Sequence, residues 1–208
     1  KQAAINLNTG VDKLLLAPLA WCFRCQHSQS STLISLESYG RPELFDNINV
    51  SRTIGWFTAV YPIVINASDI DGLEKDAKKE SIKNDIIKID QSIKLTPNSG
   101  IGWGLLKYLN PKVSEILSSS SYKESNINFN YLGEFEAYGR GIFKPASEDS
   151  GLSVAKNAPI THDLDINAAI AQGALHIVWN YNSRAFTEAR IKKMVQDFSI
   201  HLESIFEE

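Results

Sequence analysis

One carboxylate in this sequence stands where acid–base chemistry could use it. Glu37 ends residues 32–37, a short apolar and β-branched stretch that predicts a strand, and Tyr39-Gly40-Arg41-Pro42 predicts a turn directly after it. A carboxyl group at such a strand end could remove and return a proton. It could also form a surface ion pair with Arg41, and the local pattern alone favours that ion pair.

The two cysteines form a single C-x-x-C motif, Cys22 and Cys25. A zinc site would need a second pair of Cys or His ligands at a suitable spacing, and the sequence has none. A thioredoxin-like motif would follow a strand and open a helix, whereas this pair lies late in an apolar helical stretch. We therefore expect two reduced, partly buried thiols.

Other familiar catalytic patterns are missing. The glycine-rich segment 100–104 lacks the G-x-G-x-x-G spacing and follows no clear strand, so it does not predict a dinucleotide site. His162 and Asp163 are adjacent, and neighbouring side chains of a strand point to opposite faces, so they do not predict an acid–base pair. We expect structural or surface roles for the four histidines, which are His27, His162, His176 and His201.

Composition excludes several classes of protein. The chain has 208 residues and a formal charge of -3, which argues against a nucleic-acid binder. No apolar stretch approaches the ~20 residues that span a bilayer. The first eight residues lack the basic-then-apolar order of a signal peptide. We therefore expect a cytoplasmic protein with no nucleic-acid or membrane partner.

Helices and strands are predicted in a mixed order. The first half predicts a buried helix over 11–24, kinked or displaced by Pro18, and a second strand over 56–65, where Pro62 indicates an edge or a bulge. A charged helix over 71–89 follows, with Ile82, Ile86, Ile89 and Ile93 on one face.

The second half contains the clearest elements. Residues 97–104 predict a loop, 105–109 a short helix, 118–121 a flexible turn, 126–132 a strand and 139–159 a long loop. Residues 162–171 and 174–181 predict a hairpin, and an amphipathic helix follows with Thr187 as its N-cap. The predicted fold class is α/β or α+β, a mixed sheet covered by helices.

Four segments, in this order, resemble the epimerization domains of nonribosomal peptide synthetases. They are residues 37–43 (ESYGRPE), 51–62 (SRTIGWFTAVYP), 97–104 (PNSGIGWG) and 129–135 (FNYLGEF). The family carries E-G-H-G-R-E, R-T-V-G-W-F-T-x-x-Y-P, P-x-x-G-x-G-Y-G and F-N-Y-L-G at these places, and residues 12–17 look like its D-x-L-L-x-A element. The resemblance covers about residues 11–206.

The sequence departs from the family pattern in two ways. In the first motif, Ser38, Tyr39 and Pro42 replace Gly, His and Glu, and Trp103 replaces a Tyr in the third. The family also has an N-terminal lobe with H-H-x-x-x-D-G, a motif that this sequence lacks. We therefore expect residues 1–208 to form a single C-terminal lobe whose N-terminal lobe is missing.

The resemblance implies a fold similar to chloramphenicol acetyltransferase, with two lobes around a channel. It implies an aminoacyl or peptidyl thioester on the 4'-phosphopantetheine of a carrier protein as substrate, no directly bound cofactor, and inversion at Cα by two acid–base groups. The carrier protein and the N-terminal lobe are the implied partners.

The same resemblance suggests site residues. Glu37 matches the family's catalytic Glu, and Asn130 and Tyr131 match a site segment, although neighbours in a strand face opposite sides. Tyr39, Arg52 and Trp56 are candidate substrate-binding residues; Arg52 could instead form an ion pair that fixes the turn, and Trp56 could pack in the core. A condensation-type acyltransferase and a degenerate carrier-docking or scaffold lobe remain alternatives.

Overall fold

We describe the protein from a computed structural model, which describes residues 2–27, 29–120, 122–135, 148, 151, 155 and 158–206. Its helices are α1 (Gln2–Asn6), α2 (Val11–His27), α3 (Lys75–Lys94), α4 (Gly102–Leu109), α5 (Pro111–Ser119) and α6 (Glu188–Ser204), with a 3-10 turn η1 (Pro97–Gly100). Its strands are β1 (Ser31–Tyr39), β2 (Thr58–Asn66), β3 (Ile127–Phe135), β4 (Leu164–Ala171) and β5 (Ala174–Tyr181).

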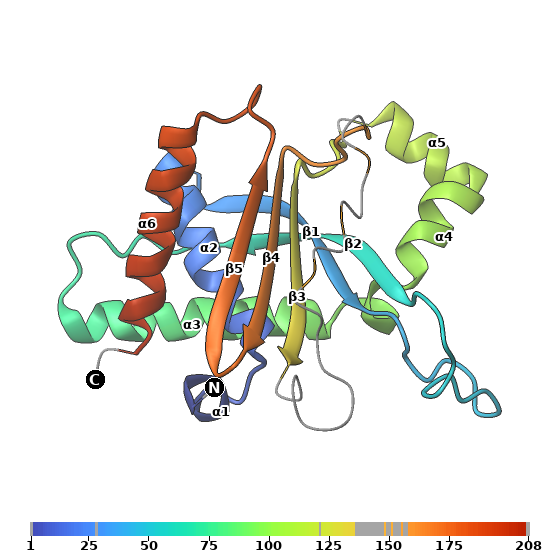
Figure 1. The fold of residues 1–208 in the computed structure, drawn as a ribbon, viewed down its shortest axis with the longest axis horizontal. Helices are drawn as coiled ribbons and strands as arrows, with labels where there is room; N and C mark the ends of the chain where they lie inside the picture. Colours follow the sequence, from blue (N-terminus) through green and yellow to red (C-terminus); the bar gives the residue numbers. More distant parts are fainter. Residues whose placement is uncertain are drawn as a thin grey trace.

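The strands form one mixed sheet in the order β2-β1-β3-β4-β5 (Figure 1). The two outer pairs, β1–β2 and β4–β5, are antiparallel, whereas β3 pairs in parallel with both β1 and β4. β2 is therefore an edge strand, which confirms the edge position indicated by Pro62 because proline cannot donate to a second neighbour.

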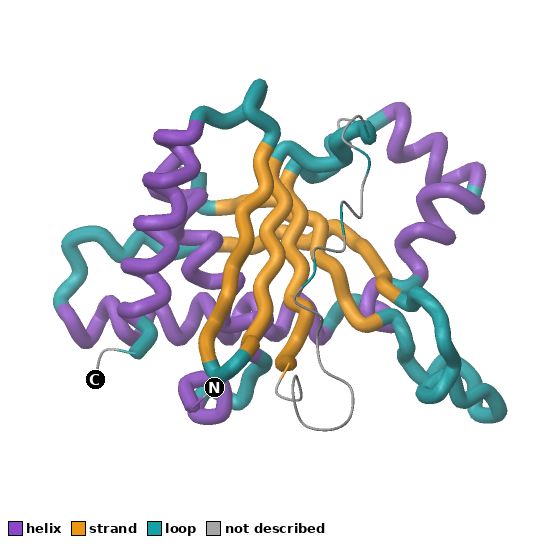
Figure 2. Tube along the Cα trace, viewed as in Figure 1, coloured by secondary structure: helices purple, strands orange, loops and turns teal. Residues whose placement is uncertain are grey.

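Helices α2, α3 and α6 pack together on one face of the sheet, and α4 and α5 stand beside its β2 edge (Figures 1 and 2). Successive side chains of a strand point to opposite faces of the sheet, so every second residue of a strand is buried against the helices. In β1, Ile34 and Leu36 face the helices, and in β4, Leu164 and Ile166 do so. The core therefore lies between the sheet and these helices, and the odd-numbered residues of β1 and β4 point to the opposite, outer face.

Two features hold the helical layer onto its core. The Asp85 carboxylate, 2% exposed, accepts the Trp21 indole N–H at 2.9 Å and the backbone N–H of Ser68 at 2.7 Å. Thr187 accepts the backbone N–H of Arg190 and so caps α6, as its position predicts. The Asp85 bonds satisfy polar groups that burial would otherwise leave unpaired, and the exposed Thr187 cap satisfies an N–H in the first turn of α6.

Several predictions are confirmed by these elements. The hairpin of β4 and β5 turns at Gln172-Gly173, and Ile82, Ile86 and Ile89 are buried along α3. α2 begins at Val11 with Pro18 inside it, so the proline does not displace the start of the helix. The predicted mixed sheet covered by helices is the observed fold.

Other predictions are wrong. Residues 97–104 are not a loop throughout, because α4 begins at Gly102 after η1. The predicted turn at 118–121 falls partly inside α5, whose start is fixed by Asn110 accepting the Val113 N–H and by Pro111 in the first turn. β2 begins at Thr58, which leaves Trp56 outside the strand. Most of the predicted loop 139–159 lies outside the described residues.

Candidate functional site

The outer face carries a line of acidic and amide side chains where β1, β3, β4 and β5 lie side by side. We call it the polar row, and it consists of Glu37, Asn128, Asp165, Asn167 and Asn180. The register that brings it together pairs Ser35 with Asn128 and Asn128 with Asp165. Because alternate residues share a face, Asn128 then lies between Glu37 of β1 on one side and Asp165 of β4 on the other.

Hydrogen bonds connect the row from strand to strand. The Asn128 Nδ2 donates to Glu37 Oε1 at 2.8 Å and to Asp165 Oδ1 at 2.9 Å. The Nδ2 of Asn167 and that of Asn180 donate to Asp165 Oδ2 at 2.8 and 3.4 Å. The candidate acid–base residue is thus tied to a second carboxylate through one amide.

Glu37 does not form the ion pair with Arg41 that its local sequence favours. The Arg41 guanidinium donates to the backbone carbonyls of Val50 and Gly55 and lies 3.8 Å from the centre of the Phe57 ring. The Glu37 carboxylate is half-buried and accepts its hydrogen bond from Asn128. Its position therefore suits proton transfer better than surface charge pairing.

Of the other predicted site residues, Asn130 and Tyr39 lie on the same face of the sheet as Glu37. Asn130 lies two residues after Asn128 in β3, and Tyr39 lies two residues after Glu37 in β1, so each shares a face with the earlier residue. The Tyr39 side chain is 73% exposed. Tyr131 packs against the hydrophobic core on the helix side. The structure therefore brings Asn130 and Tyr39 to the outer face and leaves Tyr131 on the other.

Arg52 and Trp56 lie in the loop 40–57 between β1 and β2, which projects from the body of the molecule (Figures 1 and 2). Trp56 is 89% exposed, so it is not a core residue. Arg52 is exposed and forms no ion pair with any other residue that the structure describes. Neither side chain is brought into the polar row.

A cavity of about 520 Å³ opens between β2 and α4, and none of the residues of the polar row lines it. Ser35 and Val60 contribute to its floor, and Val60 pairs directly with Glu37 across β1 and β2. Its wall includes Trp103 and Lys107 of α4, and Lys107 pairs with Glu124 at 2.5 Å. The cavity is therefore a mostly uncharged recess large enough for an amino-acid side chain.

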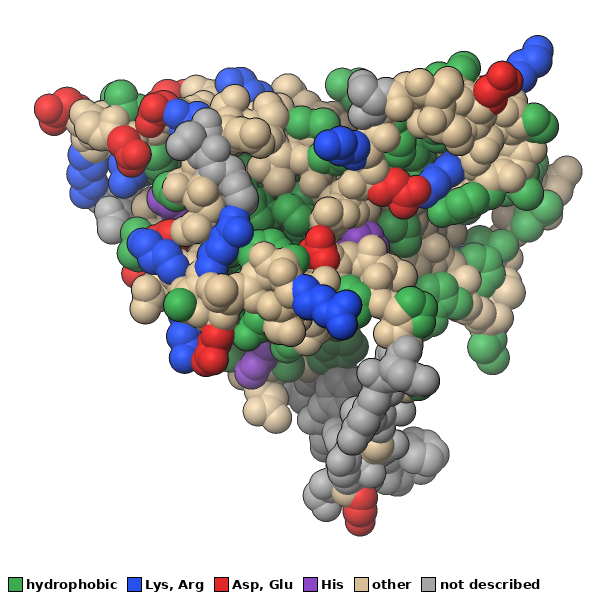
Figure 3. All heavy atoms as spheres, turned by 90° about the horizontal axis from the view of Figure 1, so that it is seen from above, with side chains coloured by type: hydrophobic (Ala, Val, Ile, Leu, Met, Phe, Trp, Pro, Cys, Tyr) green, Lys and Arg blue, Asp and Glu red, His purple; other side chains and the backbone are tan. Residues whose placement is uncertain are grey.

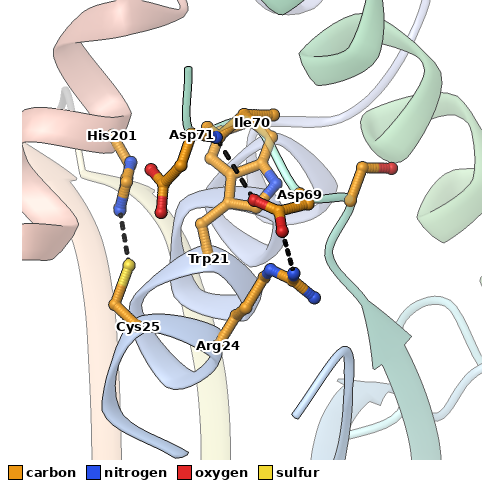
Figure 4. Close-up of a pocket in the computed structure, with 8 residues that line it drawn as sticks. Trp21, Arg24, Cys25, Asp69, Ile70, Asp71 and His201 are labelled. Carbon is orange, nitrogen blue, oxygen red and sulfur yellow. Dashed lines mark hydrogen bonds and ion pairs between the residues drawn. The ribbon is translucent and has the colours of Figure 1, made fainter. Parts of the chain in front are cut away.

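A second cavity, of about 360 Å³, lies among α2, α6 and the segment after β2 and contains the exposed cysteine (Figure 4). The Cys25 Sγ is 3.6 Å from His201 Nε2, and Arg24 pairs with Asp69 at 2.7 Å. Burial raises the pKa of the Cys25 thiol and lowers the pKa of His201. A neutral thiol beside a neutral imidazole is not an activated nucleophile.

Charged side chains of both signs are interspersed on the face of the molecule that Figure 3 shows. Lysines and arginines lie close to aspartates and glutamates over the described part of that face, and hydrophobic side chains are scattered between them (Figure 3). A nucleic-acid binder would instead gather its basic side chains into a patch or a stripe. This surface therefore agrees with the weak negative charge of the sequence.

Both cysteines are free, as expected, with Cys22 buried and Cys25 more exposed than expected.

Among the described residues, no group of three or more His, Cys, Asp or Glu could hold a metal ion. Within the same residues, no helix combines the length and the apolar character needed to cross a bilayer. The polar row is thus the candidate active site.

The chain thus folds as a mixed five-stranded sheet that helices cover on one face and that carries an acid–amide row on the other. The chain belongs to the condensation domain family, whose model matches residues 1–208. Its sequence is 33% identical over 201 residues to bacitracin synthase 3 of Bacillus licheniformis, covering 95% of this chain and 3% of that protein. It is 28% identical over 208 residues to gramicidin S synthase 1 of Brevibacillus brevis, covering 96% of this chain and 18% of that protein.

Solved structures agree with this assignment. The epimerization domain from the third module of tyrocidine synthetase B superposes with a TM-score of 0.81 at 26% identity, covering 99% of this chain and 43% of that one. The first condensation domain of the CDA synthetase gives a TM-score of 0.59 at 12% identity, covering 98% of this chain and 41% of that one, and shows the shared fold alone. The chain thus matches a small part of large nonribosomal peptide synthetases.

Sequence reasoning missed Asn128 and Asp165. The signal that could have found them is the alternation Leu164-Asp165-Ile166-Asn167 together with the polar positions of residues 126–130. Polar residues that alternate with core residues in a central strand indicate a second, functional face. The register that joins them to Glu37 is visible only in the fold.

Proposed function

We propose that this chain is the C-terminal lobe of an epimerase that inverts the Cα of an aminoacyl or peptidyl thioester on a carrier protein. Glu37 is one of its two acid–base groups. The observation that carries the proposal is the Glu37 carboxylate itself, held by Asn128 on the outer face and left free of Arg41. Its neighbours Ser35, along β1, and Val60, across to β2, line the 520 Å³ cavity.

The proposed reaction needs only proton transfers. Glu37 takes the proton from Cα, and the electron pair of the C–H bond moves into an enolate whose charge rests on the thioester oxygen. A second group on the opposite side of the substrate then gives a proton back to Cα. The resemblance assigns that group to the second His of H-H-x-x-x-D-G in an N-terminal lobe.

Other residues of the chain have parts in this proposal. Asn130 lies on the face of Glu37, where its amide could donate to the enolate oxygen. Tyr131 packs toward the core, so we assign it to shaping β3 rather than to the reaction. Tyr39 is the substrate-binding candidate nearest to Glu37 along the strand, and Arg52 and Trp56 of the projecting loop would meet the carrier protein or its 4'-phosphopantetheine arm.

Two alternatives are favoured by specific observations. The matching family model is described as a condensation domain, which supports a condensation-type acyltransferase. Tyr39 and Pro42 depart from the first motif, which supports a lobe that only docks a carrier protein. The similarity to a tyrocidine synthetase epimerization domain, at 26% against 12% for a condensation domain, supports epimerization over both.

The test uses the full-length protein that contains this chain, with a carrier protein loaded with an L-aminoacyl thioester in D₂O. After hydrolysis of the thioester, the deuterium at Cα and the chirality are measured. We expect deuterium and D-product with the parent protein and neither with Glu37→Gln. A parent that forms a peptide bond with a second loaded carrier but never exchanges Cα would establish the acyltransferase instead.

A further inference from the structure

The side chain of Asn128 joins two carboxylates from the two strands that flank it. An amide NH₂ has two hydrogens, and Asn128 gives one to Glu37 of β1 at 2.8 Å and the other to Asp165 of β4 at 2.9 Å. Asn128 is 5% exposed, so water does not compete for these hydrogens. Its nitrogen therefore has no further capacity to donate.

The bond leaves the Glu37 carboxylate with one oxygen fixed and one available. Oε1 accepts from Asn128, whereas Oε2 accepts no hydrogen bond from any described residue. The Asn128 contact thus fixes the rotation of the carboxyl group about its last side-chain bond. A base that meets Cα with a defined oxygen reacts faster than one that rotates, because misplacement of the reacting atom by about 1 Å can cost about 100-fold in rate.

Asp165 decides which end of the Asn128 amide faces Glu37. An isolated amide could turn by half a rotation and present Oδ1 to Glu37, where two oxygens would repel. Asp165 prevents this because it accepts only from the nitrogen, and it is held in place by Asn167 at 2.8 Å. The orientation of Asn128 therefore depends on a carboxylate that does not contact Glu37.

This arrangement does not serve stability alone. The Oδ1 atom of Asn128 is buried and has no hydrogen-bond partner among the described residues. An unpaired buried acceptor destabilises the folded state, because it has lost its hydrogen bonds to water and gained none in the protein. A smaller or apolar residue would avoid that cost, which points to a functional reason for the amide at this position.

We propose that Asn128, oriented by Asp165, is a positioning residue that aims the Glu37 carboxylate at Cα. The proposal rests on the proposed function, because it assigns a role within the same proton transfer. It differs from the family motifs, which assign no role to either residue: Asn128 precedes the F-N-Y-L-G segment, and Asp165 lies outside all four segments.

The first test measures Cα exchange in D₂O with the full-length protein at varied concentrations of loaded carrier. Asn128→Ala should lower kcat for exchange by about 100-fold and leave KM for the loaded carrier unchanged. Its free energy of unfolding should change little, because removal of the unpaired Oδ1 offsets the loss of the two hydrogen bonds that the amide donates. Asn66→Ala, an Asn-to-Ala change on an exposed position of the edge strand, is the matched control and should exchange like the parent.

The second test separates positioning from packing through conservative variants. Asp165→Asn keeps an oxygen that can accept from Asn128 and should retain most of the activity, whereas Asp165→Ala should lose it. Asn128→Asp keeps the size of the side chain but offers no donor to Glu37 at neutral pH, so it should lose exchange as Asn128→Ala does.

The outcomes distinguish this proposal from the function on which it rests. Exchange that is absent in the parent, or unchanged in Glu37→Gln, overturns the proposed function. Exchange that Glu37→Gln abolishes but Asn128→Ala leaves at the parental rate overturns the role of Asn128 alone. A loss in Asn128→Ala that parallels a loss of stability, with exchange at the parental rate in Asn128→Asp, also overturns it.

Discussion

Arg41 follows Glu37 by four residues, yet its guanidinium turns away from that carboxylate and lies 3.8 Å from the centre of the Phe57 ring. It also donates to the carbonyls of Val50 and Gly55. Gly40 makes this possible, since a side chain there would place its Cβ 1.7 Å from the Phe57 carbonyl oxygen. Arg41 therefore organises the loop 40–57 and leaves Glu37 to Asn128.

Arg41→Ala should loosen that loop without unfolding the sheet. It removes two hydrogen bonds and two cation–π contacts, with Phe57 and with Tyr39, and such a contact is worth about 0.5–2 kcal/mol. We expect faster cleavage within residues 40–57 in limited proteolysis, followed by mass spectrometry of the fragments. Arg52→Ala, an exposed arginine in the same loop, is the matched control. Equal cleavage rates for the two variants would show that Arg41 does not hold the loop.

Asp85→Ala should destabilise the helical layer by about 3 kcal/mol, because it leaves the buried indole N–H of Trp21 and the Ser68 N–H without their acceptor. Urea unfolding followed by Trp fluorescence measures the change. Asp85→Asn keeps one acceptor oxygen and should lose less, and Asp76→Ala, in the exposed first turn of α3, should be near neutral. A loss below about 1 kcal/mol would contradict this account.

Gly100→Ala should be strongly destabilising. Gly100 has φ +80°, and a Cβ there would lie 1.9 Å from the Tyr61 ring, so both backbone and packing oppose the change. Gly104→Ala is the control, since a Cβ at Gly104 meets nothing within 4 Å and lies inside α4, where alanine favours the helix. Thermal unfolding should show Gly100→Ala below the parent and Gly104→Ala at or above it.

The two thiols should react with iodoacetamide at very different rates. Burial raises the pKa of Cys22 to about 12, and the thiol donates to the Met194 carbonyl at 3.2 Å. Cys25 is exposed, but its raised pKa keeps it mostly a thiol near neutral pH. We expect slow labelling of Cys25 that accelerates at alkaline pH, and labelling of Cys22 only after unfolding. Labelling of both at one rate in the folded protein would be inconsistent with this structure.

Acidification should lower the free energy of unfolding, because it protonates His201 more readily in the unfolded chain than in the folded one. Burial lowers the pKa of His201 below 6.5, although Asp197 opposes the shift. Between the folded pKa and 6.5 the unfolded chain binds the extra proton, so stability rises with pH through this window and falls as pH drops below 6.5. His201→Gln removes this contribution, and His176→Gln, on exposed β5, does not. Urea unfolding above and below the window should show a smaller loss for His201→Gln than for the parent.

The sequence predicts the elements whose signals are local. The hairpin of β4 and β5 follows from alternation and a Gln-Gly turn, and α6 follows from a capped amphipathic stripe. The end of α5 escapes prediction because a run of serines indicates a turn, although Ser118 and Ser119 donate to helix carbonyls. Aromatic residues favour strands, so the sequence predicts a strand that includes Trp56. In the structure Trp56 belongs instead to the loop that begins at Gly40 and Arg41.

The candidate site was predicted only in part for the same reason. Glu37 and Asn130 belong to motifs that can be recognised along the chain, and they share a face in the fold. The partners of Glu37 depend on a parallel register between distant strands, which no local pattern specifies. The sequence shows that Asn128 and Asp165 are polar positions in strands, but it does not show that they lie next to Glu37 in the fold.

The strand order has a consequence for how this domain folds. β3 inserts between β1 and β4, so the Glu37–Asn128 bond joins residues that are 91 positions apart, and no hairpin can form it early. Parallel pairing over such a separation requires closure of a long loop, which slows folding. During synthesis, Glu37 leaves the ribosome well before Asn128 and stays in water until β3 docks. The Glu37–Asn128 bond therefore forms only together with these long-range contacts of the sheet, and a partly folded domain lacks it.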